Sequence, residues 1–256
     1  MDASQMSPPA IDLPFARSHW ALFLDVDGTL IDLAATPEAV KAPPSLAPIL
    51  AAAREGLGGA LAIVSGRPIA KIDELMAPLI LPCAGEHGAE LRLPDGTVVQ
   101  ADIARAVPDD WKKRLCDVMG DWEGVLVECK RYSASVDFRQ APARQGDVRL
   151  AFETLLAENP SAFEILPAAT ALEIRHRALT KAAAVHRFMA YPPFAGRIPV
   201  FVGDDVTDED GIRAATQLGG MGFRVPEAFG GKPENVRRWL GAFAVRGAVP
   251  ISAPSG

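Results

Sequence analysis

The stretch WALFLDVDGT, residues 20–29, decides the fold. Five apolar residues end in two carboxylates, Asp25 and Asp27, which are followed by a glycine and a threonine. A short and wholly apolar run is typical of a strand buried on both faces, as in the centre of a parallel sheet. Ligands bind at the carboxyl ends of such strands. We therefore predict two acids facing a crevice; the plainer alternative is a polar turn, where Asp and Gly are common.

The flanking sequence repeats this pattern of buried strand and helix. Further apolar runs predict strands at 60–64, 79–84 and 200–202, with an edge strand at 223–225. Helices are predicted at 45–54, 68–76, 181–190, 208–217 and 232–243, and Thr180 is the expected N-cap of the third. Strands that alternate with helices indicate a doubly wound α/β fold with a mostly parallel sheet.

Between these segments the strands change character. Runs near 90–93, 125–128, 132–138 and 171–175 alternate between apolar and polar residues, which is typical of an antiparallel sheet with one wet face. The segment 94–97 is a hairpin turn signal, and 108–119 and 142–157 are helix candidates. We predict an α+β unit at 91–177, inserted in an α/β domain of residues 18–90 and 178–250, after a flexible lead-in at 1–17.

Composition limits the possible partners and locations. The chain has 256 residues, 49% of them hydrophobic, a net charge of −6 and a pI near 5.3, which argues against binding to nucleic acid or to an anionic membrane. Three widely spaced cysteines suggest no disulfide framework or metal motif. The sequence shows neither a secretory signal nor an apolar span of about 18 residues, so we expect a cytoplasmic protein.

Four segments carry the candidate chemistry, and three of them directly follow predicted buried strands. They are Asp25/Asp27, Ser65, Lys181 and Asp204/Asp205/Asp208. Carboxylate oxygens suit a hard cation, Mg2+ above all. A metal, a lysine and a hydroxyl around an exposed carboxylate are what phosphoryl transfer requires, because they neutralise the phosphoryl oxygens while the carboxylate attacks. The acid two residues later is placed for general acid and base catalysis.

Each signal also has a plainer explanation. Asp204 and Asp208 could simply begin a helix, where acids are common, although Val206 rules out a Ca2+ loop. Ser65 could be a turn residue and Lys181 a surface lysine. Charged residues on an alternating sheet are usually solvated.

The set of motifs resembles the haloacid dehalogenase superfamily of phosphatases, and the inserted unit resembles its large second-type (C2) cap. Finer matches resemble the trehalose-6-phosphate phosphatase family over about residues 18–245. They are LDVDGTL at 24–30 with PEAV at 37–40, VSGR at 64–67, GEHGAE at 85–90, FRQAP at 138–142, LEIR at 172–175 and VGDDVTDED at 202–210.

The resemblance implies a role for each matching residue. Asp25 would be the nucleophile, and Asp27 the general acid and base, whose backbone carbonyl also binds Mg2+. Asp204 would be the remaining protein ligand of the ion, with Asp205 and Asp208 nearby. Ser65 and Lys181 would hold the phosphoryl group. The residues expected to face the sugar are Arg67, Glu86, His87, Lys130, Arg139 and Glu173.

The implied activity is Mg2+-dependent hydrolysis of trehalose 6-phosphate through an aspartyl-phosphate, with a possible functional link to the synthase that makes this substrate. The alternatives are a phosphatase or phosphomutase for another sugar phosphate, such as sucrose or mannose phosphates, and a non-catalytic partner of the synthase. Two positions depart from the family pattern: Asp137 stands where a histidine is usual, and Ala182 where a glycine is usual. The residue at position 137 is expected to affect how the sugar is recognised.

Overall fold

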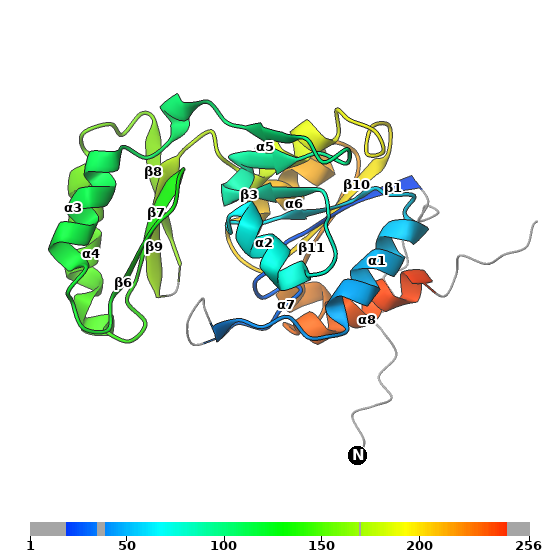
Figure 1. Ribbon diagram of the computed structural model, residues 1–256, viewed down its shortest axis with the longest axis horizontal. Coiled ribbons are helices and arrows are strands. Elements are labelled where there is room, and N and C mark those ends of the chain that lie inside the picture. Colours follow the sequence, from blue (N-terminus) through cyan, green and yellow to red (C-terminus); the bar gives the residue numbers. More distant parts are fainter. Residues whose placement is uncertain (1–18, 35–38, 169, 245–256) are drawn as a thin grey trace, which may run out of the picture.

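The structure is a computed structural model that describes residues 19–34, 39–168 and 170–244. Its strands form two sheets in two parts of the molecule, with the smaller sheet inserted between segments of the larger (Figure 1). The expected lead-in at 1–17 lies outside the described residues. No helix in the described part is long and apolar enough to cross a bilayer.

The larger sheet has seven strands and is parallel except at one end. In spatial order they are β11 (Met221–Arg224), β10 (Ile198–Gly203), β1 (Trp20–Leu24), β2 (Leu61–Val64), β3 (Cys83–Gly85), β4 (Glu90–Arg92) and β5 (Val98–Gln100). The first five run parallel, and β4 and β5 add an antiparallel hairpin beside β3. The acid-bearing β1 is central, as expected from its apolar run.

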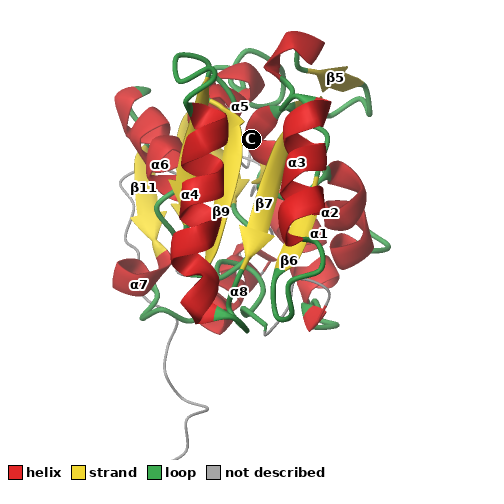
Figure 2. Cartoon of the chain, turned by 90° about the vertical axis from the view of Figure 1, so that its left-hand side faces the viewer, coloured by secondary structure: helices red, strands yellow, loops and turns green. Residues whose placement is uncertain are grey.

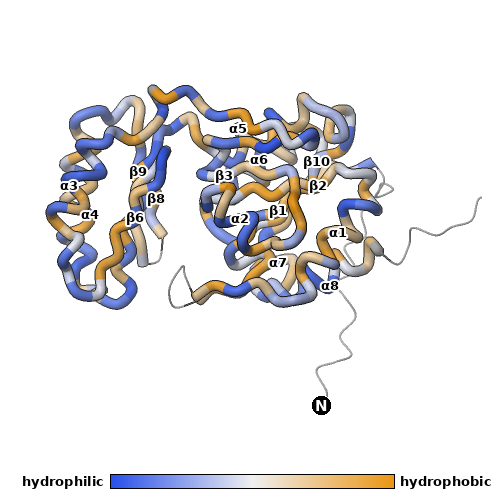
Figure 3. The backbone as a smooth tube through the Cα atoms, viewed as in Figure 1, coloured by the Kyte–Doolittle hydropathy of each residue, from blue (hydrophilic) through white to orange (hydrophobic). Residues whose placement is uncertain are grey.

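Helices cover both faces of this sheet, which explains the unbroken apolar sequence of β1. Trp20, Leu22 and Leu24 pack on one side, and Ala21 and Phe23 on the other. The first side is covered by α1 (Leu46–Gly56), α2 (Ile69–Met76), α7 (Val225–Ala228) and α8 (Pro233–Ala244), and the second by α5 (Lys181–Phe188) and α6 (Asp208–Gln217). Figure 3 shows the resulting band of hydrophobic chain through the larger part.

The smaller sheet is antiparallel, with the strand order β6 (Leu126–Cys129), β7 (Ser133–Asp137), β9 (Ala171–His176) and β8 (Phe163–Pro167). Helices α3 (Asp109–Met119) and α4 (Gln145–Leu156) cover its outer face (Figure 2). We call this sheet and its two helices the cap. Short 3-10 helices complete the chain: η4 (Glu86–Gly88), η5 (Ile103–Arg105) and η6 (Pro142–Arg144).

Alternation along the cap strands gives the sheet two different faces. Ala134 and Val136 of β7 and Ile174 of β9 are fully buried against α3 and α4. Ser135, between Ala134 and Val136, and Glu173, next to Ile174, have their side chains on the opposite face of the sheet. Both line a cleft between the cap and the larger part. The wet face predicted from the alternating sequence is therefore the face turned toward the larger sheet.

The predicted start of the inserted unit at residue 91 does not coincide with the change of sheet. Strands β4 and β5 join the larger sheet, and the smaller sheet begins only at β6. Leu91 is buried in the core under α5, whereas the Arg92 guanidinium on the other face pairs with Asp73 of α2. Alternating polarity indicates one less buried face, but it does not tell which sheet a strand joins.

Most other predicted elements are present within a few residues of their expected ends. Thr180 caps α5 as predicted, because its hydroxyl accepts the Ala183 amide at 3.0 Å. Several elements were not predicted, among them β5, β8 and the four-residue α7. β8 mixes apolar and charged residues in only five positions, a pattern too short to separate a strand from a loop.

The close approach of α6 to β10 depends on a glycine. A Cβ on Gly211 would lie 2.4 Å from the ring of Phe201, which is fully buried. We expect Gly211→Ala to lower the free energy of unfolding by about 1–3 kcal/mol through overpacking. This outweighs the roughly 1 kcal/mol that alanine gains in a helix interior. Urea unfolding of both proteins measures the difference.

Gly241 in α8 is the matched control, since a Cβ there meets no described atom within 4 Å. Gly241→Ala should stabilise the protein by about 0.5–1 kcal/mol. If both substitutions stabilise it equally, α6 and β10 are not packed closely at Gly211.

Candidate active site

The carboxyl ends of the central strands open into a cleft of about 510 Å3 between the larger sheet and the cap. The residues of the larger part that line it include Asp25, Asp27, Ser65, Arg67, His87, Lys181, Asp205 and Thr207. Those of the cap include Glu128, Lys130, Ser135, Arg139 and Glu173. Segments that are far apart in sequence therefore meet at one place, as the rule for parallel sheets predicts.

A buried lysine lies between two buried carboxylates at the bottom of this site. Lys181 Nζ is 2.8 Å from Asp25 Oδ1 and 2.6 Å from Asp208 Oδ1. The three side chains are 3%, 6% and 0% exposed, respectively. Lys181 is the first residue of α5, so the partial positive charge at that helix end adds to its own.

Asp208 also organises the loop that follows β10. Its Oδ2 accepts the backbone amides of Asp204 at 3.1 Å and Asp205 at 3.2 Å. Asp205 Oδ1 in turn accepts the amide of Thr207 at 2.8 Å and its hydroxyl at 2.7 Å. The acids at this helix start thus hold the loop in shape, and they leave Asp204 directed toward the end of β1.

The charge of this cluster is incompletely balanced. Burial, and then the Asp208 carboxylate, raise the pKa of Asp25 well above its usual value, more than Lys181 lowers it. Burial, followed by Asp208 and Asp205, raises the pKa of Asp204 to about 7. Burial alone would lower the pKa of Lys181, but Asp208 and Asp25 outweigh it and raise that pKa. The single positive charge of Lys181 therefore does not neutralise all the carboxylates around it.

The same carboxylates are arranged to hold a cation. Oxygen atoms of Asp25, Asp204 and Asp208 lie within 4.8 Å of one another. Gly28, with a φ of 72°, allows the turn after β1 to approach Asp204, because a Cβ there would lie 2.0 Å from its Oδ2. The Thr29 hydroxyl lies 3.3 Å from Asp25 Oδ2 and 3.5 Å from Asp204 Oδ1. An all-oxygen set with excess negative charge fits a hard divalent cation.

Asp27 lies at the wall of the cleft and is held by an arginine. Arg67 donates two parallel hydrogen bonds to it, 2.6 Å from Nε to Oδ2 and 2.7 Å from Nη2 to Oδ1. The Arg67 amide also donates to Ser65 Oγ at 3.2 Å. Burial lowers the pKa of Arg67, but its hydrogen bonds and ion pair with Asp27 outweigh this effect and raise the pKa, so the guanidinium stays charged.

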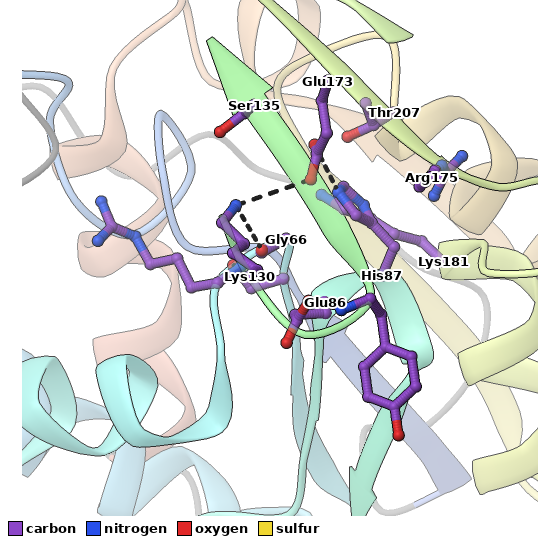
Figure 4. A network of polar contacts seen from close by, with 12 residues as sticks. Gly66, Glu86, His87, Lys130, Ser135, Glu173, Arg175, Lys181 and Thr207 are labelled. Carbon is purple, nitrogen blue, oxygen red and sulfur yellow. Dashed lines mark hydrogen bonds and ion pairs between the residues drawn. The ribbon is translucent and has the colours of Figure 1, made fainter. Parts of the chain in front are cut away.

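Where the cap faces the larger part, three of the residues expected to face the sugar form one network (Figure 4). His87 Nε2 is 3.1 Å from Glu173 Oε2, and Lys130 Nζ is 3.7 Å from Glu173 Oε1. Lys130 also donates to the carbonyl oxygen of Gly66 at 3.3 Å. The network therefore connects the cap strands to the loops that follow β2 and β3.

The protonation states in this network follow from burial and charge. Burial raises the pKa of Glu173, but Lys130 and then His87 oppose it and lower the pKa strongly. Burial lowers the pKa of His87, and the Glu173 carboxylate compensates only in part. At neutral pH the network holds an ionised Glu173, a charged Lys130 and a neutral His87.

Arg139, also expected to face the sugar, lies at another edge of the cleft. Its Nη1 donates to the carbonyl oxygen of Ala34 at 2.6 Å, which is a direct contact between the cap and the larger part. Its Nε and its amide donate to Asp137 at 2.7 Å and 2.8 Å. Asp137 thus holds the Arg139 guanidinium in place.

Glu86 is placed differently from the other residues expected at the sugar. Its side chain is buried, and Oε2 accepts the backbone amide of Tyr132 at 2.8 Å. The structure thus brings Asp25, Asp27, Ser65, Lys181 and Asp204 together with Arg67, His87, Lys130, Arg139 and Glu173 around one cleft.

Some residues at the cleft were not predicted. Glu128 and Ser135 line it from β6 and β7, and their side chains are 3.5 Å apart. Because side chains alternate along a strand, Glu128 lies on the same face as Lys130 two residues later. That spacing was a usable signal for Glu128, whereas nothing in the sequence distinguished Ser135 from an ordinary polar strand residue.

Comparison with known proteins supports one family over nearly the whole chain. The family model described as Trehalose-phosphatase matches residues 23–237. A probable trehalose-phosphate phosphatase of Sinorhizobium fredii is 41% identical over 239 residues, which are 92% of this chain and 88% of that protein. The trehalose-6-phosphate phosphatase of Escherichia coli is 32% identical over 220 residues, 86% of this chain and 82% of that protein.

Solved structures agree at the level of the fold. The C-terminal domain of a Candida albicans trehalose-6-phosphate phosphatase superposes with a TM-score of 0.73 at 17% identity, covering 89% of this chain and 93% of that one. A haloalkanoate-superfamily phosphatase of Bacteroides thetaiotaomicron gives 0.52 at 15%, covering 83% and 85%. The fold is therefore that of the haloacid dehalogenase phosphatases, with a cap, and the chain belongs to the trehalose-phosphatase family.

Proposed function

We propose that this phosphatase hydrolyses trehalose 6-phosphate to trehalose and phosphate, with Mg2+ and through an aspartyl-phosphate on Asp25. Family membership supports the substrate. The observation that carries the chemistry is the buried Lys181 between Asp25 and Asp208, beside Asp204. Of the two carboxylates that Lys181 contacts, Asp25 is the one that lines the cleft, so positive charge lies beside a carboxylate that substrate can reach, as attack on a phosphate dianion requires.

In the first half of the reaction, an Asp25 oxygen attacks phosphorus. A new bond forms between this oxygen and phosphorus, and the bond from phosphorus to the sugar oxygen breaks. The Asp27 carboxyl group gives its proton to the departing sugar oxygen. Ser65 and Lys181 bind phosphoryl oxygens, since both line the cleft next to Asp25.

In the second half, Asp27 takes a proton from a water molecule whose oxygen attacks phosphorus. The bond between Asp25 and phosphorus then breaks, phosphate leaves, and both acids return to their starting states. Arg67 pairs with the Asp27 carboxylate before substrate enters, so the general-acid role requires the Arg67 guanidinium to turn away and Asp27 to take up a proton from solvent first. Arg67 also lines the cleft, so its guanidinium can bind the substrate once it has turned away from Asp27.

Asp25, Asp204 and the backbone carbonyl of Asp27 would hold the Mg2+ ion, with Asp205 and Asp208 shaping the loop around it. When bound, the ion supplies positive charge that neutralises the phosphoryl oxygens. We place the disaccharide against Lys130, Arg139 and Glu173, whose polar groups can orient sugar hydroxyls. We also propose a cytoplasmic location, supported by three free cysteines, and a functional link to the trehalose-6-phosphate synthase.

Replacing the nucleophile tests the central assignment. We expect Asp25→Asn to lower the rate of phosphate release at least about 1,000-fold, because an amide is too weak a nucleophile toward phosphorus. Phosphate release under saturating substrate measures the effect. Asp117→Asn, an exposed acid on α3, is the matched control and should keep full activity. Intact activity of the Asp25 variant would refute its role.

A panel of sugar phosphates tests substrate and metal together. We expect rapid phosphate release from trehalose 6-phosphate with Mg2+, little from glucose 6-phosphate or sucrose 6-phosphate, and none from any of them with a chelator in excess. Release from another sugar phosphate instead would keep the chemistry and overturn the substrate. Release that continues in chelator would overturn the metal requirement.

Asp204→Asn provides a control for the metal site that does not depend on turnover. Mg2+ should raise the melting temperature of the natural protein, because it binds only the folded state. In the variant this rise should require at least about tenfold more Mg2+.

The protonation state of His87 gives a pH prediction. Its pKa is lowered in the folded protein, chiefly by burial, while the unfolded chain titrates near about 6.5. The unfolded state therefore binds this proton more readily, so the contribution of His87 to the free energy of unfolding should fall as pH falls from about 7 to about 5, while the raised pKa of Asp204 contributes in the opposite direction. Urea unfolding at each pH should show that the free energy of unfolding of His87→Gln, relative to that of the natural protein, rises as pH falls across this range. The exposed His186 of α5 is the control, and equal slopes for His87→Gln and His186→Gln would contradict the prediction.

A further inference from the structure

The turn after β3 has an uncommon backbone. Glu86, His87 and Gly88 have φ values of 44°, 57° and 94°, and among the described residues Glu86 and His87 are the only non-glycines with positive φ. Such conformations are costly for residues with a side chain and persist only where the surroundings hold them. Here the amides of Glu86 and His87 donate to the carbonyl oxygens of Arg67 and Ser65, both at 3.0 Å.

This left-handed turn directs two consecutive side chains from the larger part toward the cap. His87 reaches Glu173 on β9, as described above. Glu86 reaches the backbone amide of Tyr132, just before β7, at 2.8 Å. In an ordinary extended chain, successive side chains point to opposite sides. The strained backbone is therefore what lets both residues contact the cap from one short segment.

Tyr132 lies where the cap joins the larger part. Its ring is fully buried in a small cluster with Ala89 and Leu179. Its hydroxyl donates to the carbonyl oxygen of Ala101 at 3.3 Å. Ala101 and Leu179 belong to the two segments that connect the larger sheet to the cap. Tyr132 is thus held by both connections, and Glu86 holds its backbone from the side of the active site.

Lys130 is attached to the same fixed point. The Lys130 amide donates to the carbonyl oxygen of Ser133 at 3.0 Å, which closes the turn between β6 and β7 around Tyr132. From this turn the Lys130 side chain reaches Gly66 and Glu173 at the cleft. A shift of Tyr132 would displace Lys130 directly, because only one residue separates them.

We propose that Glu86 is a positioning residue that fixes the Tyr132 backbone and thereby sets Lys130 against the sugar of the substrate. This assigns Glu86 a different task from direct contact with the sugar. The inference rests on the proposed function, because it uses Lys130 as a substrate contact. It predicts that Glu86 affects sugar binding and leaves attack on phosphorus intact.

The test compares two substrates in the full-length protein with Mg2+. Trehalose 6-phosphate needs the cap contacts, whereas p-nitrophenyl phosphate has no sugar and depends on the groups around Asp25. Removing a hydrogen bond to a charged group typically changes an equilibrium about tenfold or more. We expect Glu86→Ala to raise KM for trehalose 6-phosphate about tenfold and to leave kcat/KM for p-nitrophenyl phosphate within about twofold.

Two further variants separate positioning from general damage. Glu86→Gln keeps a carbonyl oxygen that can accept the Tyr132 amide, so it should restore KM to near the natural value. Glu90→Ala is the matched control, since Glu90 contacts Gln100 of the neighbouring strand and should leave both activities unchanged. If Glu86→Ala does not fold, Glu86→Leu takes its place in both the substrate comparison and the cycle below.

A double-mutant cycle with Lys130 tests the route of action. If Glu86 acts through Lys130, then Lys130→Ala combined with Glu86→Ala, or with Glu86→Leu, should raise KM no more than the worse single variant does. Additive effects, an unchanged KM in Glu86→Ala, or equal losses on both substrates would overturn the proposal. Failure of the natural protein on trehalose 6-phosphate, with activity on p-nitrophenyl phosphate, would instead overturn the proposed substrate.

Discussion

The ion triplet of Lys181 with Asp25 and Asp208 is the constraint on which the rest of the structure depends. Removing three charges from water is costly, and mutual attraction compensates only when the geometry is close. Here the lysine lies 156 residues from one carboxylate and 27 from the other. The triplet can therefore form only when β1, α5 and α6 are all in place. It makes assembly of the larger sheet and assembly of the active site one event.

The triplet also explains the electrostatic character of the site. One lysine beside Asp25, Asp204 and Asp208 leaves excess negative charge in a buried place. Burial first, and then the Asp208 and Asp205 carboxylates, raise the pKa of Asp204 to about 7. A protein can relieve such repulsion by protonating a carboxylate or by binding a cation. Gly28 lets the turn after β1 come close enough to Asp204 for the carboxylates to bind a cation together. The same arrangement that strains the charge balance thus creates affinity for a metal ion.

The sequence predicted that these residues converge, because their convergence follows from topology. Parallel strands end at one edge of a sheet, so acids after β1 and β10 and the serine after β2 had to converge. The prediction that Lys181 belongs to the site was weaker from the pattern alone. A sequence does not distinguish a buried lysine from a surface lysine until its partners are known. The alternating polarity of the strands predicted that the cap sheet has one polar face. It also placed the residues of β4 and β5 in the cap, whereas these strands join the larger sheet.

What the sequence did not predict is which partner each polar side chain chooses. Arg67 and Glu86 both stand in motifs that suggested contact with the sugar, yet Arg67 binds Asp27 and Glu86 binds the Tyr132 backbone. Their partners are distant in sequence, and for Glu86 the direction of the side chain depends on a positive φ that glutamate rarely adopts. Neither fact leaves a mark in composition, spacing or periodicity.

The two sides of the cleft are fixed in different ways, and this difference fits the tasks that we propose for them. In the larger part, Asp208 and the loop it orders are held by backbone amides, and the main chain sets their positions. In the cap, Lys130 and Arg139 reach the cleft on long side chains held mostly by pairs with Glu173 and Asp137. Attack on phosphorus tolerates little displacement, because reacting atoms must be aligned closely. Sugar hydroxyls can be met by side chains that exchange one polar partner for another. The cap therefore needs only a few anchors to the larger part, and the turn at Glu86 and His87 supplies two of them beside the catalytic loops.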